Sequence, residues 1–241
     1  QGFLDLSTVQ MLILDEADRM LDMGFLPDIR RVMRHLPTKR QTLFFSATMP
    51  DSIEKLSSEL LQNPVRVGVE RKAAPASGVN QTVYPVPEDL KAELLLALLA
   101  EGNVKDVIVF TRTKHRANRV AEKLVKAGIS AERIHGNRSQ SARTEALAGF
   151  KSGKYRVLVA TDIAARGIDI DSLGHVVNFD VPNVPDDYIH RVGRTARAGQ
   201  SGEAITFCSP GEEPDLKAIE KAVGRKIPRD VVNNFDYRAK K

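Results

Sequence analysis

Three carboxylates stand within four positions near the start of the chain, at Asp15, Glu16 and Asp18. They directly follow an apolar run, residues 9–14, that reads as a strand buried on both faces of a parallel sheet. Open α/β sheets bind ligands at the carboxyl ends of their strands, so the position suits a binding site. Like charges this close repel one another, and a magnesium ion that carries a nucleotide phosphate would compensate them. The alternative is an acidic helix start, where Asp and Glu favour the first turn.

A second candidate group consists of arginines spaced three residues apart, at Arg191, Arg194 and Arg197. If the segment is helical they share one face, although Gly193 predicts an irregular backbone there. Neighbouring guanidinium groups repel one another unless an anion lies opposite them. Because Arg stays charged and binds phosphate oxygens through two N–H donors, the group suits a phosphate. The alternative is a solvated basic face.

Small polar residues follow four further apolar runs, at residues 111–113, 135–136 and 161–162 and at Asp180. The carboxyl ends of parallel strands share one edge of a sheet, so these residues are expected to converge. Hydroxyl groups, a glycine and helix starts are what the binding of a phosphate backbone needs. For any one of these positions taken singly, ordinary helix capping and turn chemistry is the better explanation.

The first 69 residues alternate strand and helix, as in the C-terminal part of an α/β domain. A helix begins at Pro27, and a second is expected to start with a capping box of Asp51 and Glu54. So short a segment is too small to bury a sheet on both faces by itself. The strands are expected at residues 9–14, 41–45 and 65–69.

Residues 70–80 lack an apolar period and read as an interdomain linker, and residues 229–241 read as a frayed tail. Between them, residues 81–228 alternate strand and helix more fully, which predicts a complete domain. Its sheet should be mainly parallel with helices on both faces. The expected strands are 82–86, 106–111, 130–135, 156–161, 175–180 and 203–208. The expected helices are 90–100, 116–127, 141–150, 186–191 and 214–223.

The composition fits a nucleic-acid-binding protein of a reducing compartment. The chain has 241 residues and a formal net charge of +5. Residues 1–68 hold 8 Lys and Arg against 9 Asp and Glu, and the remainder holds 28 against 22, so the later segment would attract a phosphate backbone. Cys208 is the only cysteine, so an internal disulfide is excluded, and this favours a reducing compartment such as the cytoplasm. Its place in an apolar run predicts that it fills the core. The apolar runs are too short to span a membrane.

The order and spelling of these groups resemble the DEAD-box ATP-dependent RNA helicases, with a spelling similar to the RhlE-type bacterial branch. The resemblance covers nearly the whole chain and implies two RecA-like domains, the second complete and the first present only in its C-terminal part. It is carried by residues 12–18 (LILDEAD), 46–48 (SAT), 109–114 (VFTRTK), 135–136 (HG) with Gln140 and Arg143, 160–169 (ATDIAARGID) and 190–197 (HRVGRTAR).

The resemblance also implies roles in ATP hydrolysis. Asp15 would hold Mg²⁺, through water, and Glu16 would polarise the attacking water. Arg194 and Arg197 would reach the γ-phosphate of ATP, with Arg197 as the arginine finger, and Asp169 would hydrogen-bond the ribose.

Further roles concern RNA and communication between the domains. His190 would couple to Asp18, and Arg191 would link to the opposite domain. Ser46 and Thr48 would pass signals between nucleotide and RNA, although hydroxyl caps at a strand-to-helix turn explain these two residue types equally well. The residues expected along the RNA path are Thr113, Gly136, Arg143, Thr161 and Asp162, all gripping the backbone without reading sequence.

A phosphate-cradling loop of the form G-x-x-x-x-G-K-[ST] is missing from the sequence. Residues 149–155 come nearest, but they have one residue too few between their glycines. The chain therefore reads as a piece of a longer helicase, inactive alone, whose partners are RNA and an upstream half of the first domain. One alternative is an RNA-binding or partner-binding module without catalysis. Another is a translocase on DNA, which the Asp-Glu-Ala-Asp spelling disfavours.

Overall fold

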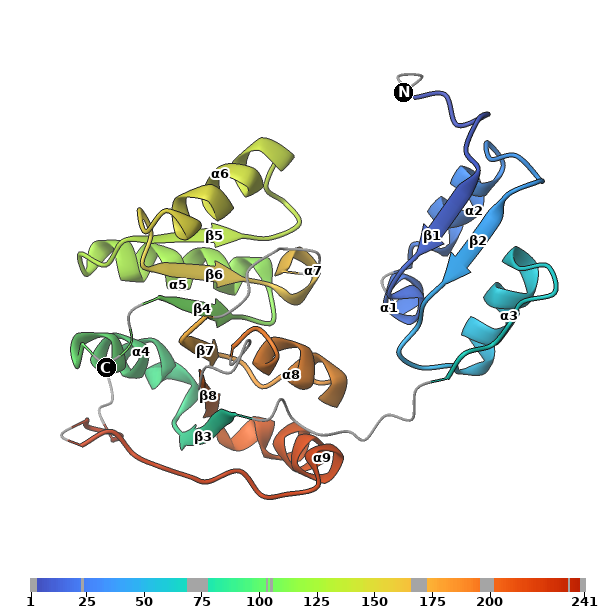
Figure 1. Cartoon of the computed structure of the whole chain (residues 1–241). Coiled ribbons are helices and arrows are strands. Elements are labelled where there is room, and N and C mark those ends of the chain that lie inside the picture. The colour runs from blue at the N-terminus through green and yellow to red at the C-terminus, as the bar shows by residue number, and fades with distance from the viewer. Residues whose placement is uncertain are drawn as a thin grey trace. The chain divides into compact units, whose positions relative to one another are not determined.

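A computed structural model shows the chain as two compact units, residues 1–70 and 71–241, which are described separately (Figure 1). The structure describes residues 4–22, 24–68, 78–102, 104, 106–165, 173–195, 202–233 and 235–238, without the side chains of residues 19, 22 and 163.

The first unit contains a two-stranded parallel sheet flanked by three short helices in its described part. The strands pair in register along their whole length, as expected for the end of a parallel α/β domain. The elements are β1 (Met11–Leu14), α1 (Ala17–Asp22), α2 (Leu26–Met33), β2 (Gln41–Phe44) and α3 (Asp51–Leu60).

Two predictions for this unit are wrong because strands need neighbours. Strand β1 is not buried on both faces: Met11 and Ile13 are 52% and 56% exposed, on a face that no described element of the unit covers. Residues 65–68 form no strand, because no described strand lies beside them to accept their hydrogen bonds, and Val65 and Val67 are almost fully exposed.

The start of α3 also differs from the prediction. Pro50, not Asp51, is the N-cap, and no side chain caps the helix. The carbonyl oxygen of Pro50 accepts from the backbone N–H groups of Ile53 and Glu54 (2.8 and 3.0 Å). The expected capping box is therefore wrong, since the backbone already satisfies these donors.

The second unit is a RecA-like α/β domain, as predicted. In its described part, six parallel strands form one sheet in the order β3-β8-β7-β4-β6-β5. The strands are β3 (Val79–Pro85), β4 (Val107–Phe110), β5 (Ala131–Ile134), β6 (Val157–Ala160), β7 (His175–Asn178) and β8 (Gly202–Cys208). The helices are α4 (Lys91–Ala100), α5 (Lys114–Lys126), α6 (Gln140–Lys151), α7 (Asp162–Ala165), α8 (Pro185–Val192) and α9 (Glu213–Val223), with 3-10 turns at Glu88–Leu90 and Pro210–Glu212.

Helices cover both faces of this sheet, which explains why the central strands β4 and β6 are apolar throughout (Figure 1). In β4, Val107 and Val109 pack into the cluster that includes α4 and α5. Ile108 and Phe110 point the other way, into the cluster that includes α6 and α7. A third cluster joins α8 and α9 to β3 and β8.

Both ends of the second unit are longer than predicted. Strand β3 begins at Val79, inside the expected linker, because Val79 is buried and pairs with β8. The prediction that residues 229–241 are a frayed tail is wrong for residues 229–233 and 235–238, which contact the second unit. Val83 in β3 donates to the Pro228 carbonyl (2.8 Å) and accepts from the Asp230 N–H (2.9 Å), and Phe235 packs against the core. No helix in the described part of the chain has the length and apolar character needed to cross a bilayer.

Candidate functional site

The acidic turn, residues 15–18, leaves the end of β1 through an unusual backbone conformation. Glu16 has φ +51°, the left-handed region that few residues other than glycine adopt, and such conformations cluster at functional sites. Its N–H donates to Asp15 Oδ1 (2.8 Å), and the next N–H, of Ala17, donates to the Phe45 carbonyl (3.0 Å). The turn is therefore fixed to the end of β2, with Asp15 exposed and Glu16 half-buried.

Asp18 points inward and is held by the loop after β2. Its Oδ2 accepts from both the backbone N–H and the hydroxyl of Thr48, each at 2.8 Å. The Asp18 N–H donates to Ser46 Oγ (3.2 Å), and this hydroxyl donates to the Thr48 carbonyl (2.7 Å). Ser46 and Thr48 thus connect the acidic turn to the next strand, while their part in signalling to RNA stays a prediction.

The carboxylates of this turn differ in what they can bind. Asp15 and Glu16 stand nearest to solvent at the carboxyl end of a strand, where a carboxylate can meet the water shell that Mg²⁺ retains. Asp18 is 7% exposed and already accepts two hydrogen bonds, so its oxygens are less accessible. Asp15 and Glu16 therefore fit a magnesium-bound phosphate, and Asp18 fits the role of a buried support.

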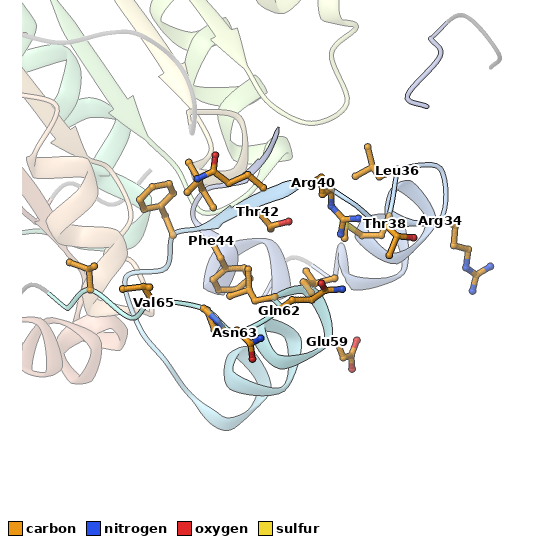
Figure 2. A pocket seen from close by; sticks show the side chains of 18 residues that line it. Arg34, Leu36, Thr38, Arg40, Thr42, Phe44, Glu59, Gln62, Asn63 and Val65 are labelled. Carbon is orange, nitrogen blue, oxygen red and sulfur yellow. The ribbon is translucent and has the colours of Figure 1, made fainter. Parts of the chain in front are cut away.

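A hollow of about 760 Å³ lies elsewhere in the first unit, along β2 (Figure 2). Thr42 and Phe44 line it from β2, and Asn63 and Val65 line it from the segment after α3. None of the described carboxylates of the acidic turn belongs to its lining. The hollow is thus a surface beside the sheet and not the site of the acidic turn.

In the second unit, the residue predicted to bind RNA after β4 is also a helix cap. Thr113 precedes α5, and its hydroxyl oxygen accepts from the Arg116 N–H (3.2 Å). The capping interpretation is therefore correct for Thr113. Its side chain is nevertheless exposed at the edge where the strands end, so an additional contact is sterically open.

The turn after β5 rests on a buried histidine. His135 is 3% exposed, and its Nε2 lies 2.9 Å from Asn118 Oδ1. Burial lowers the pKa of His135, and the cationic Arg138 and Arg133 lower it further, so the ring is neutral near pH 7. The adjacent Gly136 is exposed with no described atom within 4 Å of the Cβ position, which leaves room for a close approach.

The turn after β6 carries Thr161 and Asp162. The Thr161 N–H donates to the Ile134 carbonyl (3.3 Å), and the Thr161 carbonyl accepts from the first turns of α7. Arg143 on α6 reaches the same turn, with its Nη2 at 3.5 Å from the Ala164 carbonyl. The structure thus brings Arg143 and Thr161 together, on the edge where Thr113 and Gly136 also lie because their strands are parallel neighbours.

Asp162 is paired within the unit. Its two oxygens accept from Arg191 Nε (2.6 Å) and Nη2 (2.8 Å) in a bidentate ion pair. Arg191 Nη1 donates to the Asp180 carbonyl (2.9 Å) and to Asn178 Oδ1 (3.2 Å), and the guanidinium lies 5.1 Å from the Phe110 ring centre. Arg191 is 2% exposed and directs its hydrogen bonds into the second unit, while its link to the opposite domain stays a prediction.

Arg191 and Arg194, the two described members of the spaced arginines, do not share one helix face. Helix α8 ends at Val192, and Gly193 caps it, as the irregularity at this glycine predicted. Arg191 is therefore helical and buried, whereas Arg194 follows the helix and is half-buried. His190 lies in the last turn of α8, and Arg197, together with Asp169, lies outside the described residues.

A buried charge network, which the sequence did not predict, occupies the carboxyl ends of β4, β7 and β8. Lys91 is fully buried, with Nζ at 2.5 Å from Glu212 Oε2, 3.2 Å from Glu88 and 3.5 Å from Asp180. Arg116 forms ion pairs with both Asp180 and Glu88. Oxygens of the three acids lie within 4.8 Å of one another, but three cations face them: Lys91, Arg116 and Arg112, whose Nη2 lies 3.5 Å from Glu212 Oε1. The charge of the cluster is therefore already compensated without a metal ion. The sequence signals were the position of Asp180 after an apolar run and the i,i+3 spacing of Glu88 and Lys91.

The six-stranded parallel sheet with helices on both faces and polar turns at one edge agrees with the predicted RecA-like domain, and solved DEAD-box proteins share this fold. Two family models match the chain: a DEAD/DEAH box helicase at residues 1–56 and a helicase conserved C-terminal domain at residues 90–199. The chain belongs to the DEAD-box helicase family.

Named relatives and solved structures agree with this assignment. The chain is 46% identical to the ATP-dependent RNA helicase RhlB of Pseudomonas aeruginosa, over 94% of this chain and 58% of the relative. It is 45% identical to the DEAD-box helicase CshA of Bacillus subtilis, over 93% and 45%. Saccharomyces cerevisiae Dbp5 bound to RNA and ADP BeF3 superimposes with a TM-score of 0.84 at 31% identity, covering 96% of this chain and 62% of Dbp5. The chain thus spans about half the length of the curated relatives, and the RhlE-type assignment stays a prediction.

Proposed function

We propose that the chain supplies the second RecA-like domain and the C-terminal part of the first domain of an ATP-dependent RNA helicase. Such an enzyme would close its two domains over ATP and RNA and separate short duplexes locally. The observation that carries this proposal is the acidic turn, in which Asp15 and Glu16 reach solvent at a strand end while Asp18 is anchored on Thr48.

In this proposal the two units divide the chemistry of hydrolysis. Asp15 would hold Mg²⁺ through water, and Glu16 would orient the attacking water. Arg194 and Arg197 would stabilise the charge that builds on the transferred phosphoryl group, Arg197 as the finger. Mg²⁺, when bound, would neutralise the charge of the ATP phosphates.

Three further contacts belong to the proposal and concern coupling to the nucleotide. Asp169 would hydrogen-bond the ribose. His190 would couple to Asp18, and Ser46 with Thr48 would transmit changes at the acidic turn to the loop after β2, to which it is already bonded.

The RNA path would follow the carboxyl edge of the second sheet. Hydroxyl groups, an open glycine and an arginine stand there, and these contact the sugar-phosphate backbone without reading bases. The net positive charge of the later segment would attract this backbone. The residues assigned to this path are Thr113, Gly136, Arg143 and Thr161, with Asp162 beside them.

The upstream half of the first domain is the proposed partner of the first unit. The exposed Met11 and Ile13 form an apolar surface that the rest of such a domain would cover, and the hollow along β2, with its mixed polar and apolar lining, would be covered with it. The longer curated relatives contain sequence beyond the matched part, and this chain lacks a phosphate-cradling loop. We therefore expect no ATP hydrolysis by this chain alone. A single, buried cysteine makes the cytoplasm the proposed compartment.

The test measures ATP hydrolysis with and without RNA. The chain is assayed alone and as a joined protein, preceded by the corresponding upstream part of RhlB from Pseudomonas aeruginosa. We expect no turnover from the chain alone and RNA-dependent turnover from the joined protein, abolished by Glu16→Gln or Arg197→Ala and unchanged by Lys221→Gln on the exposed face of α9. RNA binding by the joined protein without any turnover would favour the binding-module alternative. Stimulation by DNA equal to that by RNA would favour a DNA translocase.

A further inference from the structure

Positive charges gather around the buried His135 at the end of β5. Burial lowers the pKa of His135, and four basic side chains near the ring lower it further. They come from two distant segments, which meet because Asn118, in the second turn of α5, contacts His135 (2.9 Å). These four residues form the basic cluster: Lys114, His115, Arg133 and Arg138.

The described part of the chain leaves most of this charge uncompensated. Arg138 Nη2 lies 3.6 Å from Glu132 Oε1, which is longer than a hydrogen bond, and this oxygen already accepts from the Arg133 N–H (2.9 Å). The Nε atoms of Arg133 and Arg138 are buried and have no hydrogen-bond partner among the described residues. Lys114 and His115 form no ion pair with any residue that the structure describes. The basic cluster can therefore still bind an anion.

Two helix ends add to the positive potential. Helices α5 and α6, of 13 and 12 residues, both begin at the carboxyl edge of the sheet and lack acidic residues in their first turns. A helix N-terminus carries a partial positive charge, so Asp and Glu stabilise it whereas cations do not. Helix α5 nevertheless places Lys114 and His115 there, the second of them exposed. An anion bound at the basic cluster would offset both the helix ends and the cations.

The basic cluster borders the proposed RNA path. Gly136 directly follows His135, and the Arg138 N–H donates to the His135 carbonyl (3.0 Å), so Gly136 and Arg138 share one turn. Lys114 directly follows Thr113. Strand β5 is the outermost strand on its side of the described sheet, and α5 and α6 pack against it from opposite faces (Figure 1). An RNA strand held by Gly136 and Thr113 thus lies beside the basic cluster.

We propose that the basic cluster binds phosphate groups of the RNA strand outside the path assigned above, and so lengthens the contact between RNA and the second unit. The inference rests on the proposed function and extends its RNA site. Lysine and arginine neutralise the phosphates of a nucleic acid and release condensed counterions, which makes binding dependent on salt. Contacts of this kind carry no sequence information. The basic cluster would therefore raise the affinity for longer strands of any sequence.

An acidic protein surface is the other partner with the right charge. The position of the basic cluster favours RNA, because two residues assigned to RNA, Gly136 and Thr113, are its immediate neighbours in the chain. A strand already held at these two residues is present at a high local concentration, so weak phosphate contacts suffice to bind it. A separate acidic protein would have to bind through the basic cluster alone.

The experiment measures RNA binding by the joined protein described above. Single-stranded RNAs of increasing length, each labelled with a fluorophore, are titrated at several salt concentrations and followed by fluorescence anisotropy. The test variant combines Lys114→Gln with Arg138→Gln, and a second variant, Lys114→Arg with Arg138→Lys, keeps both charges. The matched control is Lys217→Gln with Lys221→Gln, which removes the same charge from the exposed face of α9.

For long RNAs we expect the slope of log affinity against log salt to be shallower by roughly 1.4 in the test variant, since each phosphate contact of a single strand contributes about 0.7. Between about 50 and 200 mM salt, the parent should therefore lose about sevenfold more affinity than the test variant. The gain of affinity with RNA length should shrink in the test variant and stay in the variant that keeps both charges. The matched control should behave like the parent.

Two results would overturn the proposal. If the slope and the length dependence of the test variant equal those of the parent, the basic cluster contacts no RNA, and an acidic protein surface becomes the better partner. If the matched control loses as much as the test variant, net charge and not the basic cluster is responsible. If the test variant does not fold, Lys114→Glu decides, because an acid suits the first turn of a helix, and parental RNA binding in this variant refutes the inference. A joined protein that binds no RNA of any length would refute the proposed function as well.

Discussion

Replacing the buried Lys91 by Met should destabilise the second unit strongly. Methionine keeps an unbranched side chain of similar length, so the packing of the stem is preserved and the loss is that of the ammonium group. That group lies 2.5 Å from Glu212 and 3.5 Å from Asp180, and all three side chains are buried. Breaking a buried ion pair by removing one partner costs about 3–5 kcal/mol, since a buried charge loses its compensation.

The remaining contacts place the expected cost near the lower end of this range. Glu212 keeps hydrogen bonds from the Val181 N–H (3.2 Å) and from the N–H and hydroxyl of Ser209 (3.0 and 2.8 Å). Asp180 keeps its ion pair with Arg116. We therefore expect a loss of about 3 kcal/mol in the free energy of unfolding. For a unit of this size that lowers the midpoint of thermal unfolding by roughly 6–12 °C.

Tyrosine emission provides the assay. The chain has no tryptophan, and its four tyrosines, at positions 84, 155, 188 and 237, all belong to the second unit. Unfolding of the whole chain, followed by this emission, thus reports on the second unit alone. Lys123→Met, which removes a half-buried pair, serves as the control and should cost less than about 1 kcal/mol.

A second variant separates charge from packing. Lys91→Met combined with Glu212→Gln removes the uncompensated charge, so it should recover at least about half of the loss. Our reasoning is refuted if Lys91→Met costs less than about 1 kcal/mol. It is also refuted if the combined variant is no more stable than Lys91→Met, because packing rather than charge would then be responsible.

Three further predictions concern other parts of the second unit. Burial raises the pKa of the Cys208 thiol to about 12, so a thiol reagent at pH 8 should modify the chain only after unfolding; rapid modification of the native chain would contradict this. Burial opposes ionisation of Glu220, but hydrogen bonds from Arg229 and a backbone N–H outweigh it and lower the pKa. The ion pair of Glu220 with Arg229 therefore stabilises the second unit fully above pH 4.5, the ordinary pKa of Glu, and this stabilisation is lost as the pH falls through the lowered pKa. Glu220→Gln should remove this pH-dependent stabilisation, as acid-unfolding curves would show. In Gly149→Ala, the added methyl group would overlap the Tyr155 ring and should lower the free energy of unfolding, measured with denaturant, by about 1–3 kcal/mol. Adding Tyr155→Ala should relieve the overlap. Equal stability of Gly149→Ala and of the double variant would argue against the overlap.

The sheet of the second unit was predictable because its central strands are buried on both faces. Residues 156–161 were expected as a strand, and β6 is Val157–Ala160, an uninterrupted apolar run whose residues are all buried. The same rule failed for β1 and for residues 65–68. A strand takes half of its burial and its hydrogen bonds from neighbours. Strand β1 has a described neighbour on one side only, and residues 65–68 have none.

The candidate site was only partly predictable for a related reason. The carboxylates of the acidic turn at the end of a strand follow from order along the chain, whereas the hydrogen bonds of Asp18 with Ser46 and Thr48 were not predicted. The partner of Lys91, in contrast, is Glu212, which is 121 positions away, and no local pattern joins them. Regular spacing also suggested that the arginines act together. Because α8 ends at Val192 with Gly193 as its C-cap, Arg191 lies inside the helix and is buried, whereas Arg194 lies outside the helix.

The C-terminal segment that bonds to Val83 has a consequence for association between molecules. An uncovered edge strand offers free N–H and C=O groups to other chains and promotes aggregation. Pro228 and Asp230 occupy this edge of β3, while β5 at the opposite edge carries the charged Glu132 and Arg133. The C-terminal segment thus covers part of the edge at β3, and the charged side chains of β5 disfavour pairing with another chain at the opposite edge. A second domain shortened to end with α9 would lose the first of these protections, and we expect it to self-associate where the longer form stays monodisperse.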